Sequence, residues 1–134
     1  MSKKNILIVD DSFVMRALLR GIISADPDLA VVGEATNGLE ALQTIKELNP
    51  DLVLLDIEMP HMDGIECLKR LRLISNVPVI IVSSVAQTGS PQALETRKLG
   101  AAEVIAKPSG AMSLDLNAKK GHEIVTASRK VLGL

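Results

Sequence analysis

Five short runs of β-branched and aliphatic residues recur along this chain, and a pattern typical of a helix follows each one. The runs are Asn5–Val9, Ala30–Gly33, Asp51–Leu55, Val77–Val82 and Glu103–Ala106. Most are apolar on both faces rather than alternating, as expected for parallel strands that helices cover above and below. Strands that alternate with helices predict an α/β domain with a parallel sheet and right-handed crossover connections.

Local signals indicate where the helices begin. The expected starts lie after Asp11 or Ser12, at Asn37-Gly38, at Asp63-Gly64 and at Ser90-Pro91. In the first helix an apolar stripe at spacings of three and four indicates the face that packs on a core. Its members are Phe13, Val14, Ala17, Leu18 and Ile22. In the last helix Ile124, Ser128 and Val131 share one face.

Length and composition limit the organisation and the function. The 134 residues suit one core, so we expect a single domain over residues 1–134, in which 109–121 is the least certain segment. A formal net charge of −1 gives no basic surface for nucleic acid or an anionic membrane. The chain has no Trp or Tyr, and Phe13 is its only aromatic residue, which disfavours base stacking and aromatic ligand cages.

Cys67 is the only cysteine, so the chain offers neither an internal disulfide nor a zinc cluster. No apolar stretch approaches the length of a membrane span. We therefore expect a cytoplasmic domain.

Charged and hydroxyl residues follow four of the five expected strands. They are Asp10-Asp11 after the first, Asp56 after the third, Ser83-Ser84 after the fourth and Lys107-Pro108 after the fifth. Parallel strands end at a common edge, and ligands bind there at the point where the winding direction reverses. If the strand order is 2-1-3-4-5, the first and third strands flank that point and their three aspartates meet.

Three neighbouring carboxylates repel one another and cannot all ionise unless a cation lies among them. Oxygen ligands with a partly open shell suit Mg²⁺. Lys107 and Ser83 add a positive charge and a hydroxyl, the groups suited to surround a phosphoryl oxygen. Each motif alone has a structural interpretation as a helix cap or a turn. Together they predict phosphoryl transfer to a carboxylate nucleophile.

The same motifs resemble the receiver domain of two-component response regulators. The resemblance covers residues 4–132. It rests on Val9-Asp10-Asp11-Ser12, Leu55-Asp56-Ile57-Glu58-Met59-Pro60 with Asp63-Gly64, Val82-Ser83-Ser84 and Ala106-Lys107-Pro108. It implies a doubly wound, flavodoxin-like (CheY-like) α/β fold, with a five-stranded parallel sheet of order 2-1-3-4-5 and five helices.

The resemblance also implies a role for each acidic position. Asp56 is the implied phospho-acceptor and takes the phosphoryl group from a partner histidine kinase. Asp11 and Asp56 are the implied direct ligands of Mg²⁺, together with the main-chain carbonyl of Glu58. Asp10 is implied to act on the ion through water.

Lys107 is the implied partner of the acyl phosphate, and Ser83 is implied to turn toward the phosphoryl group. Ser83, Ser84 and Val104 make up the implied switch region. Receivers commonly carry an aromatic residue where Val104 stands, and a valine cannot swing between rotamers on that scale. We therefore expect a smaller rearrangement, centred on the loop after Ser83. The Lys107–Pro108 peptide bond is expected to be cis.

Within the family, Lys107-Pro108-Ser109-Gly110 and the following Ser113–Leu116 resemble the receivers of chemotaxis protein-glutamate methylesterases (CheB). In those proteins phosphorylation relieves inhibition of a C-terminal methylesterase domain. The chain has no Gly-x-Ser-x-Gly motif, and of its histidines His61 falls in a loop and His122 opens the last helix. We therefore expect a regulatory domain rather than an enzyme. The implied partners are a chemotaxis kinase and a methylesterase domain or another output protein.

There are three alternatives to this interpretation. The chain could be a free-standing receiver that serves as a phosphorelay or phosphate-sink module. A phosphatase with an aspartate nucleophile typically has a second aspartate two residues later, where Glu58 stands here, and needs a cap for which the chain has no material. A flavodoxin-like binding module is disfavoured by the lack of Trp and Tyr.

Overall fold

The computed structural model describes residues 2–84, 89–107 and 114–134. Its strands are β1 (Lys4–Val9), β2 (Leu29–Ala35), β3 (Leu52–Leu55), β4 (Val79–Ser83) and β5 (Glu103–Ala106). Its helices are α1 (Phe13–Ser24), α2 (Gly38–Leu48), α3 (Gly64–Leu71), α4 (Pro91–Lys98) and α5 (Leu114–Val131). All strand pairs are parallel and the order is β2-β1-β3-β4-β5, which confirms the predicted α/β fold class.

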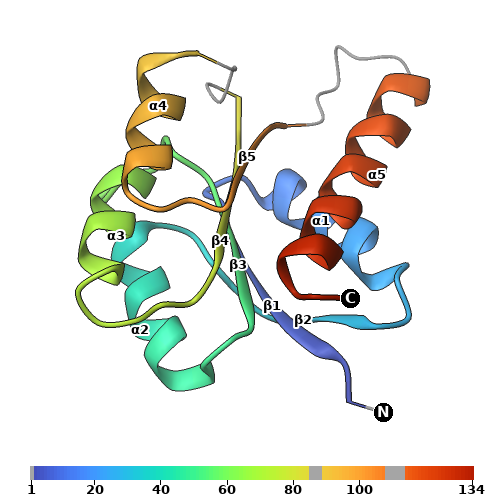
Figure 1. Ribbon diagram of the computed structural model, residues 1–134, viewed down its shortest axis with the longest axis horizontal. Helices are drawn as coiled ribbons and strands as arrows, with labels where there is room; N and C mark the ends of the chain where they lie inside the picture. The colour runs from blue at the N-terminus through green and yellow to red at the C-terminus, as the bar shows by residue number, and fades with distance from the viewer. Residues whose placement is uncertain (1, 85–88, 108–113) are drawn as a thin grey trace.

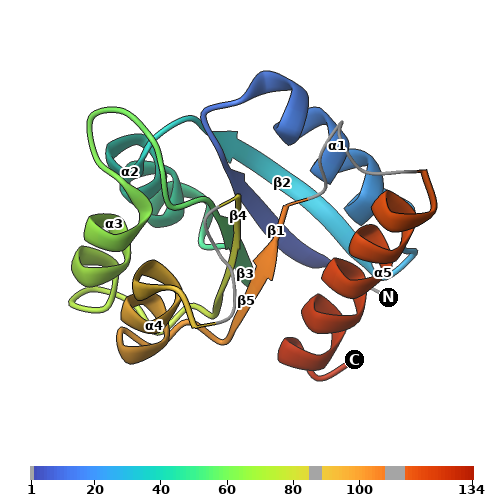
Figure 2. The same ribbon diagram turned by 90° about the horizontal axis from the view of Figure 1, so that it is seen from above.

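The sheet is covered on both faces. Helices α2, α3 and α4 lie on one side, and α1 and α5 lie on the other (Figures 1 and 2). Successive residues of β1 alternate between two apolar clusters, with Leu7 and Val9 in one and Ile6 and Ile8 in the other. This two-sided burial explains why the central strands are apolar throughout rather than alternating.

Side-chain caps start four helices at the predicted positions. The side chains of Ser12, Asn37, Asp63 and Ser90 each accept a hydrogen bond from a backbone N–H of the first helical turn. Such caps satisfy donors that the helix itself leaves free, and each is worth about 1 kcal/mol. The caps fix where α1 and α3 leave the edge of the sheet that carries the candidate site.

Two predictions about helix details are wrong. In α1 the buried residues are Leu19 and Ile23. Phe13 and Val14 are 75% and 74% exposed and Ala17 and Leu18 are exposed as well, so only Ile22 of the predicted stripe packs against the core. His122 does not open the last helix, because α5 begins at Leu114. Gly121 lies inside α5. A Cβ there would lie 3.4 Å from Ile22, because α5 passes close to α1 at this position.

In α5, Ile124 and Ser128 are fully buried. Ile124 belongs to the apolar cluster that contains Ile6 and Ile8, and Val131 packs against that cluster, as their shared helix face predicted. No helix among the described residues is long and apolar enough to cross a bilayer.

Candidate functional site at the carboxyl edge of the sheet

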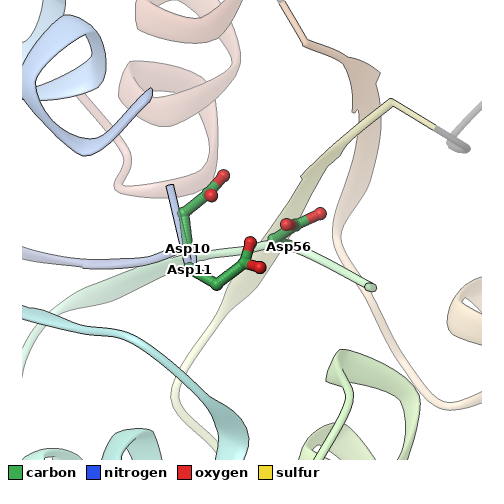
Figure 3. A group of neighbouring side chains, drawn as sticks. All are labelled: Asp10, Asp11 and Asp56. Atoms are coloured by element: carbon green, nitrogen blue, oxygen red, sulfur yellow. The ribbon is translucent and has the colours of Figure 1, made fainter. Parts of the chain in front are cut away.

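The register of β1 and β3 brings three aspartates together. Val9 pairs with Leu55, so Asp10 and Asp56 leave the sheet side by side. The Asp56 N–H donates to the Val9 carbonyl at 2.9 Å. One oxygen from each of Asp10, Asp11 and Asp56 lies within 4.8 Å of the others, and Asp11 reaches toward Asp56 (Figure 3). The predicted convergence of the three carboxylates is therefore present in the structure.

Asp10 is buried, and its Oδ2 has an ion pair with Lys107 but no hydrogen bond to the described residues. Its N–H donates to the Ala35 carbonyl at 3.0 Å. Its Oδ1 accepts from the Ser12 N–H at 2.8 Å, and its Oδ2 lies 2.8 Å from Lys107 Nζ. Asp11, the next residue, is exposed. Consecutive residues of one turn thus supply one fixed and one accessible carboxylate.

Asp56 is only 2% exposed. Its Oδ1 accepts from the Ile57 N–H at 2.8 Å, and its Oδ2 lies 3.1 Å from Lys107 Nζ. The Ser83 hydroxyl forms a further side-chain hydrogen bond to this carboxylate. Lys107 and Ser83 therefore surround the same carboxylate, as the sequence predicted.

Charge is not balanced in this cluster. Burial raises the pKa of the Asp56 carboxyl and the charge of Asp10 raises it further, while Lys107 and Ser83 offset only part of that effect. Burial lowers the pKa of Lys107, but the adjacent carboxylates of Asp10 and Asp56 outweigh it and leave that pKa raised. Lys107 supplies one positive charge to a cluster of three carboxylates. A divalent cation would neutralise the negative charge that remains.

The donor atoms suit a small hard cation. Carboxylate oxygens are the ligands that Mg²⁺ prefers, and Mg²⁺ keeps several waters, which the exposed side of Asp11 allows. The residues present therefore fit the implied ion, with Asp10, Asp11 and Asp56 as the acidic group that would hold it.

The loop from β3 to α3 closes tightly on Asp56. The Gly64 N–H donates to the Ile57 carbonyl at 2.7 Å. A Cβ on Gly64 would collide with the Asp56 main-chain carbonyl. The glycine is thus needed for close backbone approach, and it lets α3 begin directly beside the candidate site.

The remaining predicted residues lie around this cluster. Glu58 is exposed in the loop after Ile57, and Ser84 is exposed beside the fully buried Ser83. Val104 is half-buried on β5, where it pairs with Ile81 of β4. The expected cis bond before Pro108 lies outside the described residues, as does most of the loop between Ser84 and Ser90.

Sequence reasoning missed Arg16. Its Nη1 donates to the Asp10 main-chain carbonyl at 2.8 Å and its Nε donates to Glu34 at 2.9 Å. A contact to a main-chain oxygen leaves no pattern of residue types. The available signal was a basic residue one turn after the Ser12 cap, close to a predicted acidic pair.

Comparison with known proteins gives the class that this fold and acidic site define. The chain matches the response regulator receiver domain family over residues 6–119, and it belongs to that family. Among solved structures it is similar to the response regulator domain of Thermotoga maritima CheB. That likeness has a TM-score of 0.90, with 39% identity, and covers 98% of both chains.

Two curated relatives carry the name protein-glutamate methylesterase/protein-glutamine glutaminase. The chain is 49% identical to the one from Syntrophomonas wolfei and 50% identical to the one from Halalkalibacterium halodurans. The matches cover 87% and 86% of this chain but 33% of each relative. The chain therefore spans about a third of the length of these relatives.

A solved complex of the P1 domain of CheA3 with CheY6 from R. sphaeroides also matches. The TM-score is 0.80, with 42% identity, and the match covers 100% of both chains.

Proposed function

We propose that this chain is the phosphorylation-controlled receiver of a chemotaxis two-component pathway and that Asp56 is its phospho-acceptor. The observation that carries the proposal is the placement of one buried carboxylate between two aspartates and a lysine. Asp56 lies within 4.8 Å of Asp10 and Asp11, and its Oδ2 lies 3.1 Å from Lys107 Nζ. A carboxylate with a raised pKa beside a cation and a hydroxyl is suited to phosphoryl transfer.

In the proposed reaction an Asp56 oxygen attacks the phosphorus of a phosphohistidine on the partner kinase. The new O–P bond forms as the N–P bond breaks, and the imidazole leaves with the electron pair and takes a proton from solvent water. Lys107 moves with the phosphoryl group and pairs with its oxygens. Ser83 donates its hydroxyl to another phosphoryl oxygen instead of to the Asp56 carboxylate.

The proposed cofactor is Mg²⁺, which Asp11, Asp56 and the Glu58 main-chain carbonyl would bind directly and Asp10 through water. When bound, it neutralises charge that develops on the phosphoryl oxygens. The protein supplies the oxygen donors of the site. Two of the three carboxylates are buried, since Asp10 and Asp56 are 1% and 2% exposed.

The proposed kinase contact lies on α1. Phe13 and Val14 are exposed apolar side chains that immediately follow Asp11 and the cap at Ser12. Exposed aromatic residues are favoured at protein interfaces. A kinase phosphotransfer domain that packs on this patch would bring its histidine to Asp56, and the similar CheY6 was solved with a P1 domain of CheA3.

The proposed output is a chemotaxis methylesterase domain, in keeping with the names of the relatives. The phosphoryl group draws Ser83 inward, and Ser84, α4 and the strand that carries Val104 follow. The domain itself acts as a regulatory switch in the cytoplasm and not as a methylesterase.

Transfer from an autophosphorylated chemotaxis kinase tests this function. A purified kinase phosphotransfer domain that carries a labelled phosphoryl group should transfer it to the wild-type chain within the mixing time of the assay. Phe13→Ala should slow that transfer roughly tenfold, and labelling by a small acyl phosphate should be unchanged. Turnover of a generic phosphomonoester by the wild-type chain would contradict a purely regulatory role.

A further inference from the structure

Arg16 lies beside the acidic cluster yet contacts none of its carboxylates. The side chain is 13% exposed, and its Nη1 donates to the Asp10 main-chain carbonyl at 2.8 Å. The guanidinium pairs with the carboxylate of Glu34, which lies outside that cluster. Its place on a main-chain oxygen indicates a role in setting backbone geometry.

That carbonyl belongs to the peptide unit that joins Asp10 to Asp11. Because a peptide unit is planar, holding its oxygen also fixes the direction in which the chain enters Asp11. Asp10 needs little further support, since its N–H and its Oδ1 are already bound by Ala35 and Ser12. Asp11 is exposed, and no hydrogen bond joins its carboxylate to another described residue. The backbone therefore sets the direction of the Asp11 Cα–Cβ bond, from which that carboxylate extends.

Glu34 on β2 holds Arg16 in this position. Its Oε1 accepts from Arg16 Nε at 2.9 Å, and its Oε2 lies 2.6 Å from Arg20 Nη2. Burial raises the pKa of Glu34, but the hydrogen bonds from Arg20 and Arg16 outweigh it and leave that pKa lowered. Glu34 is thus ionised and fixed, and it anchors the guanidinium between β2 and the Asp10–Asp11 turn.

We infer that Arg16 is a positioning residue for the metal site. It holds the Asp10–Asp11 peptide so that the Asp11 carboxylate faces Asp56 and a divalent cation finds its ligands already placed. This inference deepens the proposed function and rests on its claim that the acidic cluster binds Mg²⁺. Loss of a residue that orients a metal ligand typically weakens metal binding 10–100-fold.

Direct metal binding to the full chain tests the role of Arg16. Mn²⁺ is a suitable probe, because the free ion gives an EPR signal, and Mg²⁺ is then added as a competitor. Arg16→Gln should weaken Mn²⁺ binding about tenfold. Arg16→Lys keeps the charge, but a single ammonium cannot replace both the Nε contact to Glu34 and the Nη1 contact to Asp10, so we expect a loss of about threefold.

Arg20→Gln is the matched control. It removes the same charge and a contact to the same Glu34 carboxylate, but Arg20 has no contact with Asp10. We expect its Mn²⁺ affinity to stay within about twofold of wild type.

Phosphorylation gives a second measurement on Arg16→Gln. Its maximal extent of phosphorylation by a small acyl phosphate should reach the wild-type level at saturating Mg²⁺, because the nucleophile is intact.

Wild-type affinity in Arg16→Gln, or an equal loss in Arg20→Gln, would overturn the inference. If Arg16→Gln shows no cooperative melting transition, Arg16→Lys carries the test, and wild-type affinity in that variant overturns the inference. A wild-type chain that binds no Mn²⁺ would instead count against the proposed metal site, so the two failures are distinguishable.

Discussion

The ammonium of Lys107 lies 3.1 Å from the Asp56 carboxylate, although 51 residues separate the two in the chain. The same ammonium lies 2.8 Å from Asp10. Lys107 is therefore the counter-ion of two buried carboxylates. A phosphoryl group on Asp56 would offer Lys107 a new partner, and a cation would take over part of its present role.

Replacing Lys107 tests how much this counter-ion contributes. Lys107→Met leaves Asp10 and Asp56 buried without their cation, so we expect a loss of about 3 kcal/mol in the free energy of unfolding. Millimolar Mg²⁺ should restore part of the loss. Lys120→Met is the control, because Lys120 forms an exposed pair with Glu123 and should cost under about 0.5 kcal/mol. Equal losses in the two variants by urea denaturation would contradict this account.

The raised pKa of Asp56 predicts a pH dependence with a definite sign. Because the folded chain holds this proton more strongly, the Asp56 contribution to stability is complete below its ordinary pKa of 3.8 and is lost as the pH rises through the folded pKa. Without metal, Asp56→Asn should therefore melt at a higher temperature than wild type at pH 7. The difference should shrink toward pH 4.

Thermal melts in a metal chelator check that prediction. The comparison at each pH cancels the contribution of Glu34, whose lowered pKa acts with the opposite sign. A wild-type chain more stable than Asp56→Asn at pH 7, or a difference in melting temperature that does not change with pH, would show that ionised Asp56 does not destabilise the folded chain.

Mg²⁺ should stabilise the folded chain, since it relieves repulsion among the three aspartates. At a concentration tenfold above its dissociation constant, the ion should add about 1.4 kcal/mol. Asp11→Asn should melt at a higher temperature than wild type without metal, and it should lose the response to Mg²⁺. A melting temperature of the wild-type chain that stays constant or falls across a Mg²⁺ titration would be inconsistent with a metal site.

Gly64 should tolerate no side chain. A methyl group there meets the Asp56 main-chain carbonyl, so Gly64→Ala should cost more than about 2 kcal/mol and displace Asp56, the proposed phospho-acceptor. Gly21→Ala is the matched control, because no atom lies within 4 Å of its Cβ and it lies inside α1. It should stabilise the chain by about 0.5–1 kcal/mol. Similar effects of the two substitutions would mean that the contact at Gly64 is not constraining.

The site was predictable because parallel strands end at one edge. Runs of apolar residues located the strands, and the residues just after them, including Asp56 and Lys107, then had to meet. The outward face of α1 was not predictable from spacing, since Phe13 and Val14 continue the apolar pattern although they are exposed. Arg16 was missed because its partner is a main-chain oxygen, whose position depends on the folded turn.

We expect Asp56 alone to accept the phosphoryl group. Intact-mass spectrometry after incubation with Mg²⁺ and a small acyl phosphate tests it most directly, with fragmentation to locate the label. The wild-type chain should gain the mass of one phosphoryl group, located on Asp56. Asp56→Asn, which keeps the size of the side chain, should gain none. Labelling of Asp56→Asn to the wild-type extent, or a label on another residue of the wild-type chain, would contradict the assignment.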